Sequence, residues 1–122
     1  MSSPARDRGA ATAELVMVLP ALVAVTIGLV WLLSVGAAQV RTVDAARETA
    51  RALARGDDRG EAIDRGVRVG VAGTRVSVST VGEHVVATAR ARVAGPGGLF
   101  GFLPDVTVRA RAVAAAEEDT AR

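Results

Sequence analysis

The chain has 122 residues, half of them hydrophobic, and a formal net charge of +2 from fifteen basic and thirteen acidic residues. This length leaves room for one small domain beside a membrane helix, and with only Trp31, Phe100 and Phe102 as aromatics the domain core must use small aliphatic side chains. The lack of cysteine excludes disulfides, thiolate metal sites and cysteine nucleophiles, and the near balance of charges argues against nucleic acid as a partner.

The N-terminal region begins with a short polar segment, Met1 to Asp7, which we expect to be a disordered leader. It is followed by an apolar run without any charge from Leu15 to Ala38. About 20 apolar residues span a bilayer as a helix, so the run predicts a transmembrane helix. One carboxylate, Glu14, stands at its start, where burial in hydrocarbon costs free energy, and this indicates that the charge has a use. Pro20 predicts a bend in the helix, because proline removes the hydrogen bond to the carbonyl four residues back.

The order of residues around Gly9 is also informative. A small residue, Ala10, follows the glycine, and Glu14 is the fifth residue after it. This arrangement resembles the type III signal of type IV prepilins. The whole string RGAATAELVMVLP, which includes Pro20, resembles the N-terminus of TadE-like proteins, the pseudopilin-like minor components of tight-adherence (Flp) pilus systems. The resemblance implies that a prepilin peptidase, a membrane aspartyl protease, cuts between Gly9 and Ala10. It also implies that Glu14 is an assembly charge, which neutralises the new amine of Ala10 in its own subunit or in a neighbour.

The pattern beyond the apolar run predicts that the helix continues. Apolar residues recur at steps of three and four as far as Gly56, which we expect to cap the helix. Spacings of three predict the ion pairs Asp44–Arg47 and Glu48–Arg51. A short second helix is predicted from Glu61 to Val69, although Gly66 disfavours it. The predicted apolar face of the long helix consists of Val40, Val43, Ala46, Ala50 and Leu53.

The last part of the chain has the period of two that is typical of strands. Three segments alternate in this way, starting near residues 74, 85 and 106, and Gly82-Glu83 fits a tight turn between the first two. A glycine-rich loop with Phe100 and Phe102 precedes the third. We expect the two aromatics to be tucked over the end of the sheet, and presentation to a partner is the alternative. With the helix covering the alanine-rich face of an antiparallel three-stranded sheet, the predicted fold class is α+β.

These elements predict five regions along the chain. They are a cytoplasmic leader (1–9), a transmembrane helix (10–38), an amphipathic extension of that helix (39–56), a small extracytoplasmic α+β domain (57–116) and an acidic disordered tail (117–122).

No set of residues indicates chemistry. His84 is the only histidine and has no cysteine or second histidine to complete a metal site, so we interpret it as a residue beside a turn. Ser77, Ser79 and Thr80 lack a base. The glycines at 95, 97 and 98 have neither a helix nor a lysine after them, so a phosphate cradle is not expected. We therefore predict no catalytic, cofactor-binding or metal-binding residues, no small-molecule substrate and no enzymatic activity.

The predicted function follows from the N-terminal signal. The chain is expected to be a single-pass protein of the inner membrane with a cytoplasmic N-terminus, even though more arginines follow the helix than precede it. Its expected partners are the membrane, the prepilin peptidase and other pilin-like subunits, the last through the transmembrane helix. It would help to assemble a Flp-type pilus or a related type II/IV-like secretion apparatus, and it could enter a surface appendage itself. The alternatives are a membrane-anchored structural subunit of another complex, and a secreted domain released by ordinary signal peptidase near Val35-Gly36-Ala37.

Overall fold

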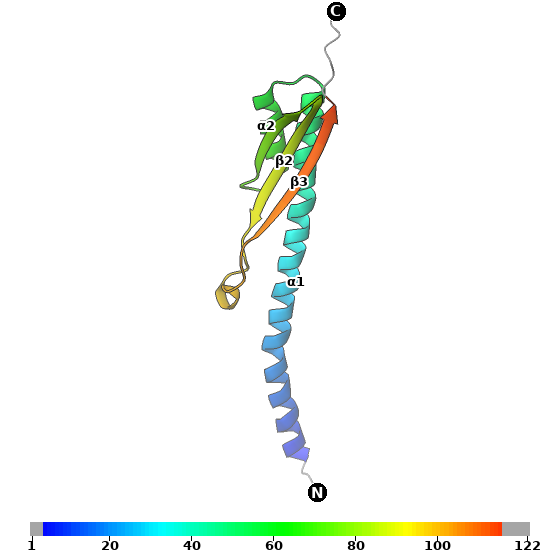
Figure 1. The fold of residues 1–122 in the computed structure, drawn as a ribbon. Coiled ribbons are helices and arrows are strands. Elements are labelled where there is room, and N and C mark those ends of the chain that lie inside the picture. The colour runs from blue at the N-terminus through cyan, green and yellow to red at the C-terminus, as the bar shows by residue number, and fades with distance from the viewer. Residues whose placement is uncertain (1–3, 116–122) are drawn as a thin grey trace, which may run out of the picture. The chain divides into compact units, whose positions relative to one another are not determined.

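The computed structural model describes residues 4–115, which form two helices before three strands. In chain order the elements are α1 (Pro4–Ala54), α2 (Arg59–Val69), β1 (Arg75–Val81), β2 (His84–Val93), a 3₁₀ helix (Gly98–Phe100) and β3 (Val106–Ala115) (Figure 1). A long apolar helix with a small antiparallel sheet confirms the α+β class. The predicted acidic tail (117–122) lies outside the described residues. The chain divides between Leu33 and Ser34 into two compact units, which are taken in turn.

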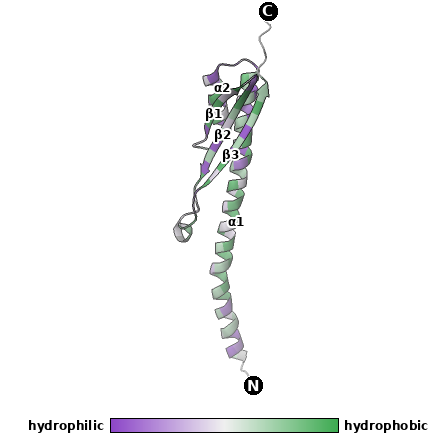
Figure 2. Ribbon diagram, in the orientation of Figure 1, coloured by the Kyte–Doolittle hydropathy of each residue, from purple (hydrophilic) through white to green (hydrophobic). Residues whose placement is uncertain are grey.

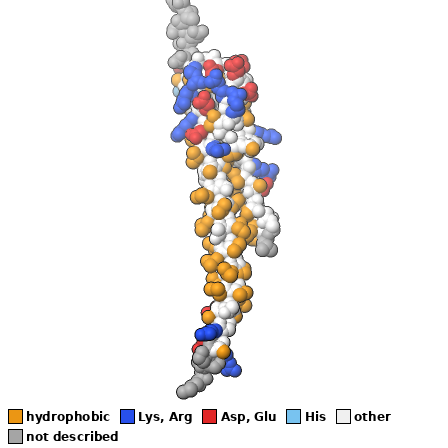
Figure 3. All heavy atoms as spheres, turned by 180° about the vertical axis from the view of Figure 1, so that it is seen from behind, with side chains coloured by type: hydrophobic (Ala, Val, Ile, Leu, Met, Phe, Trp, Pro, Cys, Tyr) orange, Lys and Arg blue, Asp and Glu red, His pale blue; other side chains and the backbone are white. Residues whose placement is uncertain are grey.

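The first unit consists of the apolar part of α1. Its large aliphatic side chains are exposed on every side, from Leu15 and Met17 to Leu32 and Leu33. Figures 2 and 3 show hydrophobic residues along this stretch of the helix. Among the described helices, α1 is the one with the length and composition needed to cross a membrane. The core helix of a soluble domain would bury such residues, so the exposure favours a lipid environment.

The start of α1 differs from the expected disordered leader. The helix already begins at Pro4, so the residues from there to Asp7 are helical. Proline is well suited to a first helical position, because the N–H that it lacks would have no partner within the helix. The helix also continues without interruption through Pro20. A bend at that residue stays a prediction.

In the second unit, the three strands form an antiparallel sheet in the order β1-β2-β3. The predicted turn is confirmed, because Val81 pairs with His84 across Gly82-Glu83. Gly82 has a φ of 60°, and no described residue other than glycine has a positive φ. A positive φ at the first turn residue alone is typical of a type II′ turn, one of the two turns that match the twist of a hairpin.

The core of the second unit lies between α1 and the sheet. Ala45 and Ala46 of α1 pack with Ala89 of β2 and Ala110 of β3. A second cluster joins Ala38 of α1 to Ala91 and Val108, with Val35, Val71, Val93 and Val106 packed around it. The predicted covering of the alanine-rich sheet face by the helix is therefore confirmed. The side chain of Gln39 also donates a hydrogen bond of 3.2 Å to the carbonyl of Arg109.

The buried face of α1 includes Ala46, Ala50 and the half-buried Val43 of the predicted apolar face, but the prediction is wrong for Val40. Val40 is 61% exposed, whereas Thr42 and Thr49 are completely buried. Their hydroxyls donate to the carbonyls of Ala38 and Ala45, at 2.7 and 2.9 Å, so burial leaves no polar atom unpaired. The physical reason is that α1 lies close to two neighbours, the sheet and α2. This close contact favours small side chains, such as alanine and threonine, over larger aliphatic ones. The buried positions on α1 are Ala38, Thr42, Ala45, Ala46, Thr49, Ala50 and Ala52.

Helix α2 confirms the predicted second helix and explains its glycine. A Cβ added to Gly66 would lie 2.0 Å from Oγ1 of Thr49 and 2.9 Å from the carbonyl oxygen of Ala45. Only glycine therefore allows α2 to approach α1 this closely. The side chain of Asp58 caps the N-terminus of α2 by accepting from the N–H of Gly60 at 3.0 Å.

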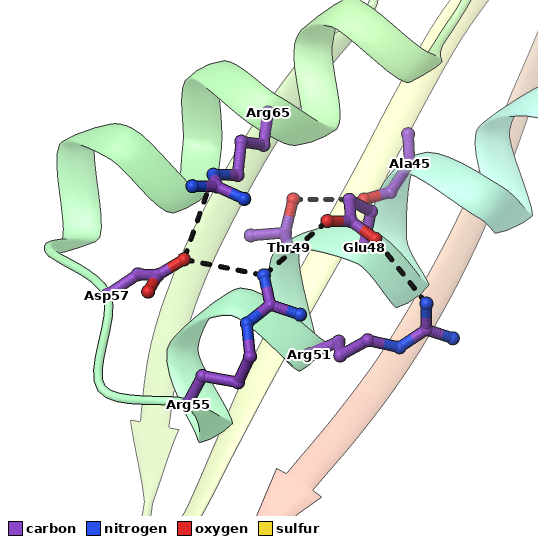
Figure 4. A network of polar contacts seen from close by, with 7 residues as sticks. All are labelled: Ala45, Glu48, Thr49, Arg51, Arg55, Asp57 and Arg65. Carbon is purple, nitrogen blue, oxygen red and sulfur yellow. Dashed lines mark hydrogen bonds and ion pairs between the residues drawn. The ribbon is translucent and has the colours of Figure 1, made fainter.

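The connection between the helices is closed by a Schellman motif and by ion pairs. Gly56, with a φ of 88°, donates to the carbonyl of Leu53, and Asp57 donates to that of Ala52. The predicted capping role of Gly56 is therefore confirmed. Figure 4 shows Asp57 between Arg55 of α1 and Arg65 of α2, with N···O distances of 3.4 and 3.7 Å.

Glu48 joins the same network through α1. It pairs with Arg51 at 3.6 Å, as predicted, and with Arg55 at 3.7 Å. Within residues 4–115, the predicted pair between Asp44 and Arg47 is not formed. These contacts are long and the arginines are exposed, so each pair contributes at most a few tenths of a kcal/mol.

The tip of the loop between β2 and β3 is held by hydrogen bonds within the loop. Three N–H groups of its tip, those of Phe100, Gly101 and Leu103, donate to carbonyls within the loop at 2.9–3.1 Å. The rings of Phe100 and Phe102 lie 6.3 Å apart. Phe100 is half-buried, but Phe102 is 77% exposed, so the expectation that both are tucked over the sheet is wrong for Phe102.

Replacing Gly66 by alanine is predicted to destabilise the second unit. Overpacking costs about 1–3 kcal/mol, which exceeds the gain in helix propensity of about 1 kcal/mol. Gly60→Ala is the matched control in the same helix, because an added Cβ there meets only the end of the Asp58 side chain, at 3.1 Å. Thermal unfolding of the full chain in detergent, followed by circular dichroism, should show a lower midpoint for Gly66→Ala alone. Equal midpoints for the two variants would contradict the close helix contact.

Candidate functional site

The predicted processing site lies in the first turns of α1. Gly9 and Ala10 are exposed residues inside the helix. A Cβ added to Gly9 would meet nothing within 4 Å, and its φ is not positive. Glycine in a helix costs about 1 kcal/mol relative to alanine. The described fold therefore provides no reason for glycine at this position.

Glu14 lies on the same face of α1 as Ala10. The two residues are four apart in a continuous helix, which places their Cβ atoms about 5–6 Å from each other. Glu14 is exposed, and within residues 4–115 it forms no ion pair. The side chain of Thr12, between them, turns back to the carbonyl of Arg8 at 2.9 Å. An amine created at Ala10 would thus lie one helical turn from a carboxylate that forms no ion pair with any described residue.

Pro20 lies on the same helix, six residues beyond Glu14, among exposed apolar side chains. Its missing N–H leaves the carbonyl of Val16 without the usual donor in the helix. The four residues taken from the N-terminal string, Gly9, Ala10, Glu14 and Pro20, are therefore all on one element within the first unit.

The other residues considered from the sequence lie apart from this site. His84 is exposed at the start of β2, directly after the hairpin turn. Ser77 and Ser79 are exposed on β1. Among the described residues, no group of three His, Asp or Glu side chains is placed to hold a metal ion. Contrary to expectation, Gly97 precedes a helix, but this helix is a single 3₁₀ turn that begins at Gly98 and ends at Phe100.

The strand register reveals a row of arginines that the sequence did not. Arg75 of β1 is directly opposite Arg90 of β2, which is directly opposite Arg109 of β3. All three are exposed, because their neighbours along the strands face the core. Arg92 on the same face pairs with Asp105 at 3.2 Å. Like charges directly opposite each other destabilise a sheet. The alternation of residues along each strand was visible in the sequence, but the register between strands was not.

Replacing Arg90 by threonine is predicted to stabilise the sheet. The substitution removes two like-charge pairs at the central strand and introduces a β-branched residue, for a gain of about 0.5–1 kcal/mol. Arg111→Thr is the matched control, because Arg111 lies on the same face opposite Thr88. Thermal unfolding at low and high salt is the measurement, and the advantage of Arg90→Thr over the control should shrink in high salt. A lower midpoint for Arg90→Thr than for the wild type would refute this account.

Comparisons with known proteins address the N-terminal part of the chain directly. Residues 9–51 match the sequence model of a family described as TadE-like protein. A protein of Mycobacterium tuberculosis named apoptosis inhibitor Rv3655c is 42% identical over 79 residues, which cover 65% of this chain and 57% of that protein. The chain thus matches little more than half the length of this relative. No solved structure matches the chain significantly. The family match begins at Gly9 and contains Ala10, Glu14 and Pro20.

Proposed function

We propose that this chain, which belongs to the TadE-like family through residues 9–51, is a membrane pseudopilin that is cut after Gly9 and helps to assemble a Flp-type pilus or a related type II/IV-like secretion apparatus. Association with tight-adherence pilus systems follows from the family. The finer statements, on the cut, the partners and the assembled structure, are the proposal. The observation that carries it is the position of Glu14, one turn from Ala10 at the head of an exposed apolar helix.

The energetics favour a paired charge over a lone one. A charged residue at the centre of a bilayer costs roughly 2.5–3.5 kcal/mol, and less near the interface. An amine and a carboxylate 4 Å apart attract by about 4 kcal/mol at an effective dielectric of about 20, compared with about 1 kcal/mol in water. Pairing with the new amine of Ala10 therefore offsets the cost of placing Glu14 at the edge of the hydrocarbon. In a neighbouring subunit, the same pair would fix the register between two helices.

The same helix provides a surface for other pilin-like subunits. Gly28 and Gly36 have open space where a Cβ would be, so a second helix could approach closely at either position. In this proposal the N-terminus is cytoplasmic, the second unit is outside the cytoplasm, and the chain crosses the inner membrane once. Enzymatic activity is not part of the proposal, because the family is structural.

The packing of α1 disfavours release by ordinary signal peptidase. Val35, in the segment suited to such a cut, packs with Ala38 against the sheet inside a continuous helix. A cut there would remove part of the core of the second unit. The name of the mycobacterial relative refers to apoptosis, and that activity is not proposed for this chain.

Replacing Gly9 by valine is predicted to block the cut. A β-branched side chain next to the scissile bond hinders the peptidase, and Gly28→Val is the matched control because both glycines have open surroundings in α1. Mass spectrometry of the chain from cells with the complete pilus system should give an N-terminus at Ala10 for the wild type and for Gly28→Val. The uncut chain should accumulate for Gly9→Val. A wild-type chain that still begins at Met1 or Ser2 would refute the proposed processing.

Replacing Glu14 by glutamine is predicted to impair assembly. Glutamine keeps the size of the side chain but leaves the new amine of Ala10 unpaired in the membrane. Asp7→Asn is the control, because it removes a carboxylate from the discarded leader. Crosslinking to other pilin-like subunits, together with the yield of pili, should fall for Glu14→Gln only. Normal maturation and normal incorporation of Glu14→Gln would exclude the role of the charge.

A further inference from the structure

The loop between β2 and β3 is uncharged over eleven residues, from Ala94 to Pro104, and presents an aromatic ring outward. Phe102 is 77% exposed, the same fraction as Leu33 in the apolar helix. A single exposed phenylalanine is common on soluble domains. Phe102 is informative because the whole loop around it is uncharged and because of where the loop lies in the second unit.

Part of the backbone at the tip of this loop is hydrogen-bonded within the loop. Its N–H groups at Phe100, Gly101 and Leu103 already donate to carbonyls in the loop. Unpaired backbone groups are what normally keep irregular segments out of lipid. At the base, Asp105 accepts from the N–H of Gly95 at 3.3 Å and pairs with Arg92 at 3.2 Å. The charges are thus held at the base of the loop, away from Phe102.

The place of the loop within the second unit identifies the apolar phase. Val93 and Val106 are the last pair of β2 and β3, and they pack against the same cluster as Val35 of α1. The loop begins directly beyond this pair, as Figure 1 shows at the ends of the two strands. It therefore lies at the end of the second unit where Ser34 enters, and Ser34 is joined by one peptide bond to the apolar run that ends at Leu33.

We propose that the loop 94–104 inserts Phe102 into the interfacial region of the bilayer that holds the apolar part of α1. This inference rests on the membrane anchoring in the proposed function. An aromatic side chain on an uncharged turn is the type of group that the membrane interface accepts. The bilayer is favoured over a protein groove because it is always present beside the point where the second unit is attached. The loop is then a second anchoring point, in addition to the helix.

Fluorescence quenching by lipid tests this proposal in the full chain. The chain is reconstituted in vesicles of phosphatidylcholine and phosphatidylglycerol, with or without bromine on the acyl chains, which quenches nearby tryptophan. The wild type has a single tryptophan, Trp31, within the apolar run. Two variants carry the probe elsewhere: Trp31→Phe with Phe102→Trp, and Trp31→Phe with Val81→Trp. Val81 is the matched control, because it is 60% exposed at the hairpin turn, at the other end of the sheet.

The expected result is a loss of emission at position 102 comparable to that of Trp31, with a shift to shorter wavelength, and no loss at position 81. Quenching of Trp31 without quenching at 102 overturns the loop proposal and leaves the membrane anchor intact. A blue-shifted but unquenched probe at 102 means burial against protein, and also overturns it. Equal quenching at positions 81 and 102 overturns it as well, because contact with lipid would then not be confined to the loop. If Trp31 is not quenched, the anchoring in the proposed function fails.

A second probe guards against a variant that does not fold. The described chain contains no cysteine, so Phe102→Cys can be labelled at one site with an environment-sensitive dye. The dye should report an apolar setting in vesicles and an aqueous one in the chain unfolded by denaturant. An aqueous spectrum in vesicles for a folded chain overturns the proposal.

Discussion

The second unit depends on how closely its backbones can approach one another. Among the described residues, its core contains alanine, valine, threonine and glycine, and no aromatic residue is buried between α1 and the sheet. Each alanine buries little apolar area, so the stability of the unit has to come from many short contacts rather than from a few large side chains. This makes the core sensitive to added volume. The contact between Gly66 and Thr49 leaves the least room. A methyl group added at Gly66 would clash with Oγ1 of Thr49 and with the backbone carbonyl oxygen of Ala45 in α1.

The elements with a clear period could be predicted from the sequence, and the buried face of α1 could be predicted only in part. The strands and the turn at Gly82-Glu83 follow from alternation and from the φ that glycine allows. The predicted apolar stripe of α1 was right at Val43, Ala46 and Ala50 and wrong at Val40. Where neighbouring elements lie close, small side chains are buried whether they are apolar or not. Thr49 is buried because it is small and can satisfy its hydroxyl on the helix itself. The pattern of hydrophobic and polar residues along the chain does not show how closely α1 approaches the sheet and α2.

For the candidate site, most of the interpretation comes from the sequence, and the structure adds less. The roles of Gly9, Ala10 and Glu14 were predicted from their order along the chain, and the structure adds that Ala10 and Glu14 share one helix face. The arginine row of Arg75, Arg90 and Arg109 was not predicted, because it depends on strand register, which brings together residues far apart in sequence. A pattern formed by neighbouring residues can be recognised in the sequence alone, whereas a surface formed by strand pairing cannot.

The glycines of the described residues fall into two groups: those that the fold requires and those that it does not require. Gly56, Gly73, Gly82, Gly97 and Gly98 have a positive φ, and Gly66, Gly70 and Gly95 are in close contact with neighbouring atoms. Gly9, Gly28 and Gly36 have neither constraint, although each weakens α1 relative to alanine. All three are on the one described helix that could cross a membrane. The described fold gives no reason for glycine at these three positions, and the proposed function supplies one: a peptidase at Gly9, and a neighbouring helix at Gly28 and Gly36. In the proposed function, α1 is thus the part of this chain whose sequence is explained by other molecules.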